Sequence, residues 1–229
     1  NSALKTGVIN FELLESGLIQ KPDGEKWITF GKSEKADINI IDSSPSLMGT
    51  TLILQFNKIN YEIKLPDFAL PDYYGETLGA AFATGVALLI DPQKIVETLA
   101  EKFTLPAGRG QLLKGINNSI IIDSSYNASR EPVVGSLELL KVVSDNKLKI
   151  AVLGDMRELG KQAKVEHEVV AKKIMETADK TILVGPLMKK YVLPILEQNG
   201  FRAKWFATAG EAAIYSKNNL PKKSVVLIK

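Results

Sequence analysis

Two short apolar runs, each followed at once by polar or glycine residues, constrain the fold of this chain more than any other feature. Residues 120–122 and 150–153 are each long enough for a buried strand. Between them, apolar residues recur at roughly helical spacing, namely Val133, Leu137, Leu139, Leu140 and Val143. A strand, a helix and a second strand in this order predict a β-α-β unit, the building block of a parallel sheet.

Polar side chains follow both predicted strands. Residues 123–127 (Asp-Ser-Ser-Tyr-Asn) come directly after the first strand, and residues 154–158 (Gly-Asp-Met-Arg-Glu) come after the second. Ligands of parallel sheets bind outside the carboxyl ends of the strands. The sequence therefore predicts a binding site built from these two segments.

The remainder of the second half alternates between helical and strand patterns. Helices are expected over residues 162–178, 188–198 and 209–215, and strands over residues 181–184, 203–206 and 224–228. Asn199-Gly200 is a typical helix stop. This alternation predicts a doubly wound, Rossmann-like α/β domain.

The first half is rich in predicted strands. Strands are expected over residues 5–11, 27–30 and 36–41, and a β-hairpin over residues 47–56 and 59–65, with Asn57-Lys58 at its turn. A helix over residues 75–90 is so rich in Ala and Gly that we expect it to lie close against a sheet. A second helix is expected to begin at Asp91-Pro92 and to end near Phe103.

Charge divides the chain near residue 105. The first 104 residues carry nine lysines and no arginine against 14 acidic residues, whereas the rest carries 20 basic and 12 acidic residues. We therefore predict two domains, residues 1–106 and 107–229. The lysines of the basic half are scattered and lack interleaved aromatic residues, so we expect no nucleic-acid partner.

Several further features bear on the class of protein. The chain has no cysteine, which excludes disulfides and thiolate metal sites and fits a reducing compartment. It has no apolar run of about 18 residues and no signal-peptide pattern, so we expect a cytoplasmic protein without a membrane span. As a separate expectation, the protein is a monomer. No Gly-x-x-x-x-Gly-Lys-Ser/Thr sequence occurs, so these residues contain no P-loop.

Local sequence leaves two interpretations open for each candidate site residue. Arg109, between two glycines, could bind a phosphate bidentately or could be a solvated loop arginine. The carboxylate and hydroxyls of residues 123–127 could help hold Mg²⁺ or a ribose, and the Asn127 amide could bind a peptide or a phosphate. The same residues could instead cap the next helix. Asp155 and Glu158 could act as paired carboxylates or bind a cationic group, or they could complement a helix dipole. His167, the only histidine, falls within a predicted helix and could be catalytic or structural.

Taken together, these motifs resemble those of the Mur ligases. The matching residues are Gly108-Arg109, residues 123–128 (Asp-Ser-Ser-Tyr-Asn-Ala), residues 152–160 (Val-Leu-Gly-Asp-Met-Arg-Glu-Leu-Gly) and His167. The order and spacing are most similar to those of the members that add D-Ala-D-Ala to UDP-MurNAc-tripeptide. The resemblance covers the whole second half and, more weakly, residues 1–104.

The resemblance implies the activity and the site. It implies a ligase of peptidoglycan precursor synthesis that uses ATP and Mg²⁺ to form an amide bond through an acyl phosphate. It assigns nucleotide binding to Arg109, Asp123, Ser124 and Tyr126. It assigns substrate binding to Asn127, Ala128, Asp155, Glu158 and His167. It assigns no certain catalytic residue and no metal ligand to this chain.

The sequence also departs from the family pattern. Ser124 stands where the family has an aspartate, and Ser129-Arg130 replaces Asn-Pro. We therefore expect a fragment, namely the rear of the central ATPase-type domain followed by the C-terminal domain, that is inactive alone. Two alternatives stay open, a non-catalytic binding protein and a related ligase or amidase with a different amine acceptor.

Overall fold

The computed structural model describes residues 6–21 and 26–229. They divide into two compact units. The first contains residues up to 45, residues 49–66 and residues 72–104, and the second contains residues 46–48, 67–71 and 105–229. Within the described residues, no helix is both long enough and apolar enough to cross a bilayer.

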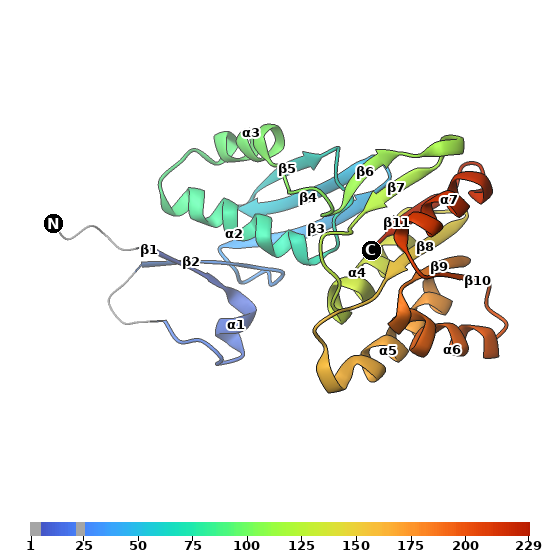
Figure 1. Ribbon diagram of the computed structural model, residues 1–229. Helices are drawn as coiled ribbons and strands as arrows, with labels where there is room; N and C mark the ends of the chain where they lie inside the picture. Colours follow the sequence, from blue (N-terminus) through green and yellow to red (C-terminus); the bar gives the residue numbers. More distant parts are fainter. Residues whose placement is uncertain (1–5, 22–25) are drawn as a thin grey trace. The chain divides into compact units, whose positions relative to one another are not determined.

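The first unit is a five-stranded mixed sheet with helices (Figure 1). Its strands follow one another in the sheet in chain order: β1 (Thr6–Asn10), β2 (Lys26–Gly31), β3 (Ile38–Ser46), β4 (Gly49–Phe56) and β5 (Ile59–Leu65). β1, β2 and β3 are parallel, whereas β4 and β5 form an antiparallel hairpin. The hairpin turn is the predicted one, and Asn57 and Lys58 both have positive φ, as its tight reversal requires.

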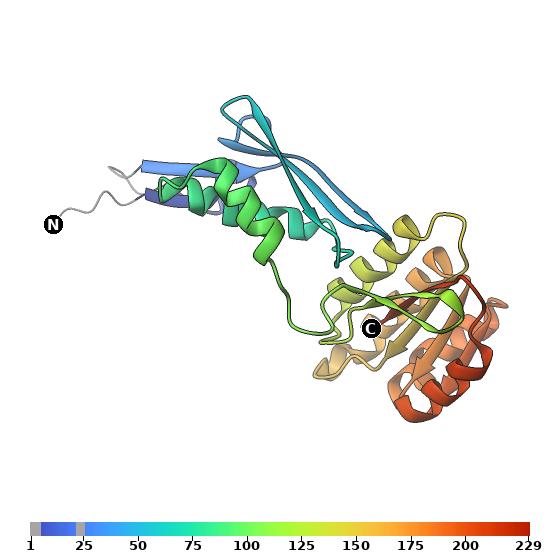
Figure 2. The ribbon, with the colours of Figure 1, turned by 90° about the horizontal axis from the view of Figure 1, so that it is seen from above.

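Three helices complete this unit: α1 (Phe11–Glu15), α2 (Tyr73–Ala87) and α3 (Pro92–Lys102). Helices α2 and α3 lie side by side in both views (Figures 1 and 2). A Cβ atom added to Gly79 would lie only 3.0 Å from Cδ1 of Ile40 in β3, which confirms that small residues let α2 lie close to the sheet. Sequence did not predict α1, and the predicted start of the first strand at residue 5 lies outside the described residues.

The second unit is an α/β domain with a six-stranded sheet. Its strands are β6 (Gln111–Lys114), β7 (Ile120–Asp123), β8 (Lys149–Gly154), β9 (Lys180–Val184), β10 (Ala203–Phe206) and β11 (Val225–Ile228). They are arranged in the order β10-β9-β8-β11-β7-β6, and all are parallel except β6, which is antiparallel to β7. The predicted β-α-β unit is confirmed as β7, α4 (Arg130–Val143) and β8, although β11 lies between its two strands.

Helices cover this sheet on both faces, as the fold-class prediction requires. The main core lies on one face, where α4, α5 (Ala163–Thr177), a π-helical turn (Met188–Val192) and α6 (Leu193–Gln198) pack. Helix α7 (Ala209–Asn219) contacts β9 and β10 and is four residues longer than predicted. Short 3-10 turns occur at Ile116–Asn118 and Gly160–Gln162.

Strand β6 was not predicted. It pairs on one side with β7 and on the other with residues 67–69, through a hydrogen bond from Leu112 N to Asp67 O and one from Ala69 N to Gly110 O. Residues 67–71, which follow the hairpin, therefore belong to the second unit and extend the β6 edge of its sheet.

Candidate functional site

A cleft of about 510 Å³ lies within the second unit, at the carboxyl ends of its parallel strands. Its walls come from the segments that follow β7, β8 and β11, from the end of β9 and from the first residue of α7. It is lined by Ser125, Tyr126, Asn127, Ala128, Val152, Gly154, Asp155, Arg157, Glu158, Val184, Ala209, Ile228 and Lys229. The fold thus brings the two polar strand-end segments into one cavity, of a size typical of small-molecule sites.

The first wall is the turn that follows β7. The Asp123 carboxylate oxygen Oδ1 accepts hydrogen bonds from Ser125 N (3.1 Å) and from Ser125 Oγ (2.6 Å). Ser124 is buried, and its backbone N–H donates to the carbonyl of Ile228 in β11 (2.9 Å). Because α4 begins only at Arg130, with Ser129 at its N-cap, the interpretation of residues 123–127 as a helix cap is wrong. Asp123 instead fixes the turn that holds Tyr126 and Asn127 at the cleft.

Arg109 is held against this turn. Gly108 and Gly110 on either side of it have φ of +79° and +82°, in the left-handed region that favours glycine. The Gly108 carbonyl accepts from Tyr126 N (3.1 Å), and the Arg109 guanidinium carbon lies 4.1 Å from the centre of the Tyr126 ring. Arg109 Nε is buried and has no hydrogen-bond partner among the described residues. The Arg109 side chain is therefore held in position with an unused hydrogen-bond donor at Nε, and it is not a freely solvated loop arginine.

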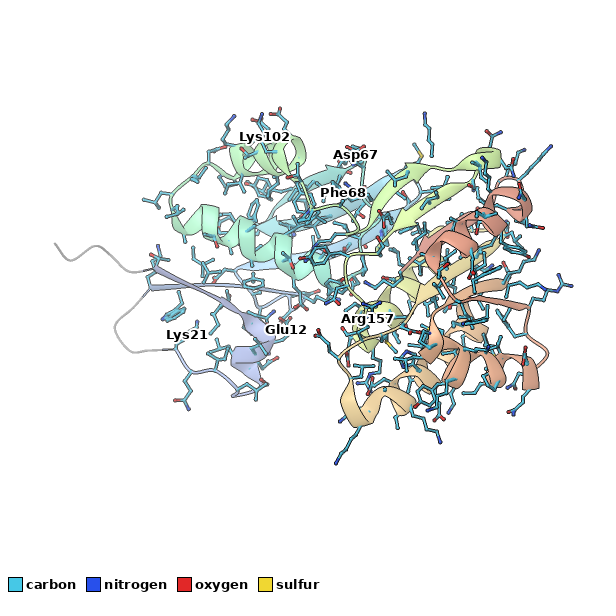
Figure 3. The ribbon with its side chains drawn as sticks, viewed as in Figure 1. Glu12, Lys21, Asp67, Phe68, Lys102 and Arg157 are labelled. Carbon is cyan, nitrogen blue, oxygen red and sulfur yellow. The ribbon has the colours of Figure 1, made fainter. Side chains whose placement is uncertain are left out.

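Positive charge collects at this edge of the sheet. Burial, and then the positive charge of Arg109, lowers the pKa of the Lys229 ammonium from its ordinary value. Arg157 is exposed on the loop after β8 and also lines the cleft (Figure 3). A bound anion would offset the repulsion between these cations, so the edge favours a phosphate or a carboxylate ligand.

The second wall is the loop that follows β8. Asp155 Oδ1 accepts from the backbone N–H of Met188 (2.8 Å) at the start of the π-helical turn. The carboxylate therefore complements a helix start, as one of the two interpretations expected, but the helix is not the one that follows it in the sequence. A Cβ at Gly185 would lie 2.6 Å from the Asp155 carboxyl carbon, so this contact requires glycine there. Glu158 is exposed in the cleft, with φ of +62°.

His167 supports the same loop from behind. The imidazole is fully buried, and its Nδ1 lies 2.6 Å from the carbonyl oxygen of Ala163, which places the proton on Nδ1. The other nitrogen, Nε2, accepts from Met156 N (3.3 Å). Both ring nitrogens are thus used by the backbone, and His167 does not line the cleft. The geometry favours the structural interpretation of this residue.

The structure places the other candidates in two groups. Tyr126, Asn127, Ala128, Asp155 and Glu158 line the cleft. Arg109, Asp123 and Ser124 adjoin it through the contacts described above. Ser125 and Arg157 also line the cleft; they belong to the two predicted strand-end segments, although the family resemblance assigned them no role. Lys229 lines the cleft and was not predicted. The strand-end argument applied to the last strand could have found Lys229, which directly follows β11.

The described residues at and near the cleft offer few ligands for a metal ion. Within residues 6–21 and 26–229, no group of three or more His, Cys, Asp or Glu side chains is placed to hold a metal ion. Of the two strand-end aspartates, Asp123 already uses Oδ1 for two hydrogen bonds, and Asp155 Oδ1 accepts from Met188 N. The donor set of these residues does not fit a Mg²⁺ site by itself.

Comparison with known proteins identifies the class to which this fold and cleft belong. The sequence model of the family described as "Mur ligase, glutamate ligase domain" matches residues 108–229, more than half of the chain. The chain belongs to the Mur ligase family.

Individual relatives point to one branch of the family. The chain is 31% identical over 207 residues to the UDP-N-acetylmuramoyl-tripeptide–D-alanyl-D-alanine ligase of Rickettsia prowazekii, in a match covering 88% of this chain and 43% of that protein. The ligase of the same name from Buchnera aphidicola is 23% identical over 205 residues, covering 89% of this chain and 42% of its own length. The chain spans less than half the length of these two relatives.

Solved structures show the same fold. MurF from Acinetobacter baumannii aligns with a TM-score of 0.77 at 20% identity, covering 99% of this chain and 49% of that one. MurF ligase from Thermotoga maritima, solved in complex with ADP, aligns with a TM-score of 0.71 at 23% identity, covering 98% of this chain and 49% of that one. At these identities the similarity carries the fold alone.

Proposed function

We propose that this chain is part of an ATP-dependent and Mg²⁺-dependent amide ligase that adds D-Ala-D-Ala to UDP-MurNAc-tripeptide in the cytoplasm, as a monomer. The printed names of the curated relatives support this reaction, and the ADP complex of a related structure supports the nucleotide. In such a reaction ATP supplies the phosphoryl group that activates the tripeptide carboxylate. Residues 1–106 correspond to the rear of the central domain and residues 107–229 to the C-terminal domain.

The single observation that carries the proposal is the cleft at the carboxyl ends of the strands. It combines exposed carboxylate oxygen at Glu158 with positive charge at Arg157 and Lys229. A dipeptide zwitterion carries an ammonium group and a carboxylate, so it complements both. We assign the substrate to Asn127, Ala128, Asp155 and Glu158, and the nucleotide to Arg109, Asp123, Ser124 and Tyr126. His167 acts by holding the loop that carries Glu158.

D-Ala-D-Ala is expected to bind this cleft and to shift the backbone amide signals of residues 125–128 and 154–158 in a ¹⁵N NMR titration. Glu158→Gln removes the charge that faces the dipeptide ammonium, so it is expected to weaken binding about tenfold. Glu197→Gln is the matched control, because it removes the same charge from an exposed site outside the cleft. Equal affinity in both variants contradicts the assignment, and cleft shifts with L-glutamate but not with D-Ala-D-Ala identify a different acceptor.

The 229 residues by themselves are expected not to hydrolyse ATP, because their sequence contains no P-loop to hold the triphosphate. Phosphate release from ATP is the measurement, compared between the chain and its Arg109→Met variant. Equal traces of release in both identify a contaminating ATPase. Release that disappears in the variant shows turnover by the chain itself and contradicts the expectation.

A further inference from the structure

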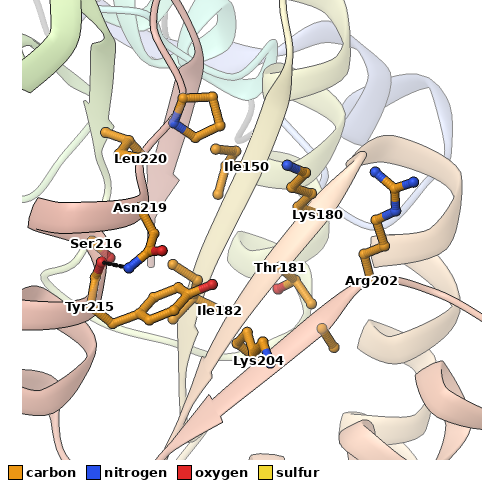
Figure 4. A pocket seen from close by; sticks show the side chains of 12 residues that line it. Ile150, Lys180, Thr181, Ile182, Arg202, Lys204, Tyr215, Ser216, Asn219 and Leu220 are labelled. Carbon is orange, nitrogen blue, oxygen red and sulfur yellow. Dashed lines mark hydrogen bonds between the residues drawn. The ribbon is translucent and has the colours of Figure 1, made fainter.

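A second cavity, of about 340 Å³, lies in the same unit at the opposite, amino-terminal ends of the strands (Figure 4). It is formed by the beginnings of β8, β9 and β10 and by the last turn of α7 with the residues after it. It shares no lining residue with the cleft at the carboxyl ends. We call it the basic pocket, because Lys180, Arg202 and Lys204 line it and no acidic residue does.

The three cations are neighbours in the sheet. Lys180 begins β9, and Arg202 directly precedes β10, where its carbonyl accepts from Thr181 N (3.0 Å). Lys204 stands opposite Ile182 in the register of β9 and β10. Within the described parts of the chain, none of the three forms an ion pair. Like charges on adjacent strands destabilise a sheet, so this arrangement favours a bound anion.

The rest of the lining of the basic pocket is mostly apolar or aromatic, with Thr181, Ser216 and Asn219 as its uncharged polar residues. Ile150 and Ile182 form a buried floor with 3% and 6% exposure. The Tyr215 ring packs against Phe206, with 5.0 Å between ring centres, and Asn219 Nδ2 donates to the Tyr215 carbonyl (2.9 Å). A ligand that fills this cavity therefore needs an apolar part as well as its charge.

We propose that the basic pocket binds a small organic phosphate. The phosphate group lies between Lys180 and Arg202, where the planar guanidinium can donate two parallel hydrogen bonds and the ammonium supplies a second charge. The apolar part of the ligand lies over Ile182 and beside the Tyr215 ring. A dianion fits better than a monocarboxylate, because it meets two cations that have no acidic partner.

Phenyl phosphate is the probe, and ¹⁵N NMR titration of the full chain is the measurement. Phenyl phosphate is expected to shift the amide signals of residues 180–182, 202–204 and 215–220, and not those of residues 154–158. Phenol, which has only the aromatic ring, and inorganic phosphate, which has only the charged group, are each expected to bind more weakly than phenyl phosphate. Added salt is expected to weaken binding, because the attraction is between charges near the surface.

Arg202→Met and Lys180→Met are each expected to weaken phenyl phosphate binding about tenfold. Lys217→Met removes the same charge from an exposed position of α7 outside the lining and is expected to bind like the unaltered chain. The spectrum of each free variant shows whether it is folded, and the shift map of the unaltered chain tests the site without any substitution. Shifts confined to the carboxyl-end cleft, or equal affinity in all three variants, overturn the proposal.

Discussion

Replacing His167 with leucine is expected to lower the free energy of unfolding by about 3 kcal/mol. The imidazole is fully buried and accepts a hydrogen bond from Met156 N while Nδ1 donates to the Ala163 carbonyl. Leucine fills similar space but leaves the buried Met156 N–H without an acceptor. Loss of a partner costs more than the net contribution of the bond, because the remaining group is already desolvated.

Urea unfolding followed by circular dichroism measures this loss. His167→Gln is expected to recover part of it, because its side-chain oxygen can accept from Met156 N near the position of Nε2. Lys172→Leu, at an exposed site on the same helix, is the control and is expected to change stability by less than about 0.5 kcal/mol. A His167→Leu protein as stable as this control contradicts the role assigned to the imidazole.

His167→Leu is also expected to affect the cleft at the carboxyl ends of the strands. Met156 is itself fully buried and lies between Asp155 and Arg157, which both line the cavity. When the loop is no longer held at Met156, the Asp155 carboxylate and the Arg157 guanidinium are positioned less precisely in the cleft. His167→Leu is therefore expected to weaken the proposed binding of D-Ala-D-Ala although His167 does not itself line the cleft, which separates a positioning role from a purely structural one.

Sequence predicted the parts of the fold that depend on neighbouring residues. The hairpin follows from Asn57-Lys58, because that turn needs positive φ at both positions. The helix from Pro92 follows from its N-cap, Asp91, whose side chain accepts from Lys94 N. The β-α-β unit and the strand-end segments follow from periodicity and from the general geometry of parallel sheets.

Long-range pairing explains what was missed. Strand β11 inserts between β7 and β8, and nothing in residues 120–153 signals that a strand more than 70 residues further on lies between them. Strand β6 exists because it pairs with β7 and with residues 67–69. Arg109 stacks on Tyr126, and His167 accepts from Met156 N, only because the tertiary fold brings these residues together. Local sequence therefore left Arg109 and His167 with two interpretations each.

Replacing Gly108 with alanine is expected to lower the free energy of unfolding by about 3 kcal/mol and to disturb the turn at Tyr126. Gly108 has φ of +79°, which alanine adopts only with strain. An added Cβ would also lie 2.7 Å from the backbone nitrogen of Tyr126 and 3.1 Å from Ser125 Oγ. Backbone atoms held in a turn cannot move aside easily, so Arg109 should lose its place over the Tyr126 ring.

Gly200→Ala provides the matched control for this prediction. Gly200 also has positive φ, at +67°, but an added Cβ there would meet nothing within 4 Å. Its loss of stability is expected to be only the conformational cost, about 1 kcal/mol. The difference between the two variants in urea unfolding isolates the close approach of Gly108 to the turn, and amide shifts at residues 125–127 report its effect on the cleft. If both variants lose the same free energy of unfolding, the close approach of Gly108 to the turn contributes nothing to stability. In that case Gly108 does not hold Arg109 in place.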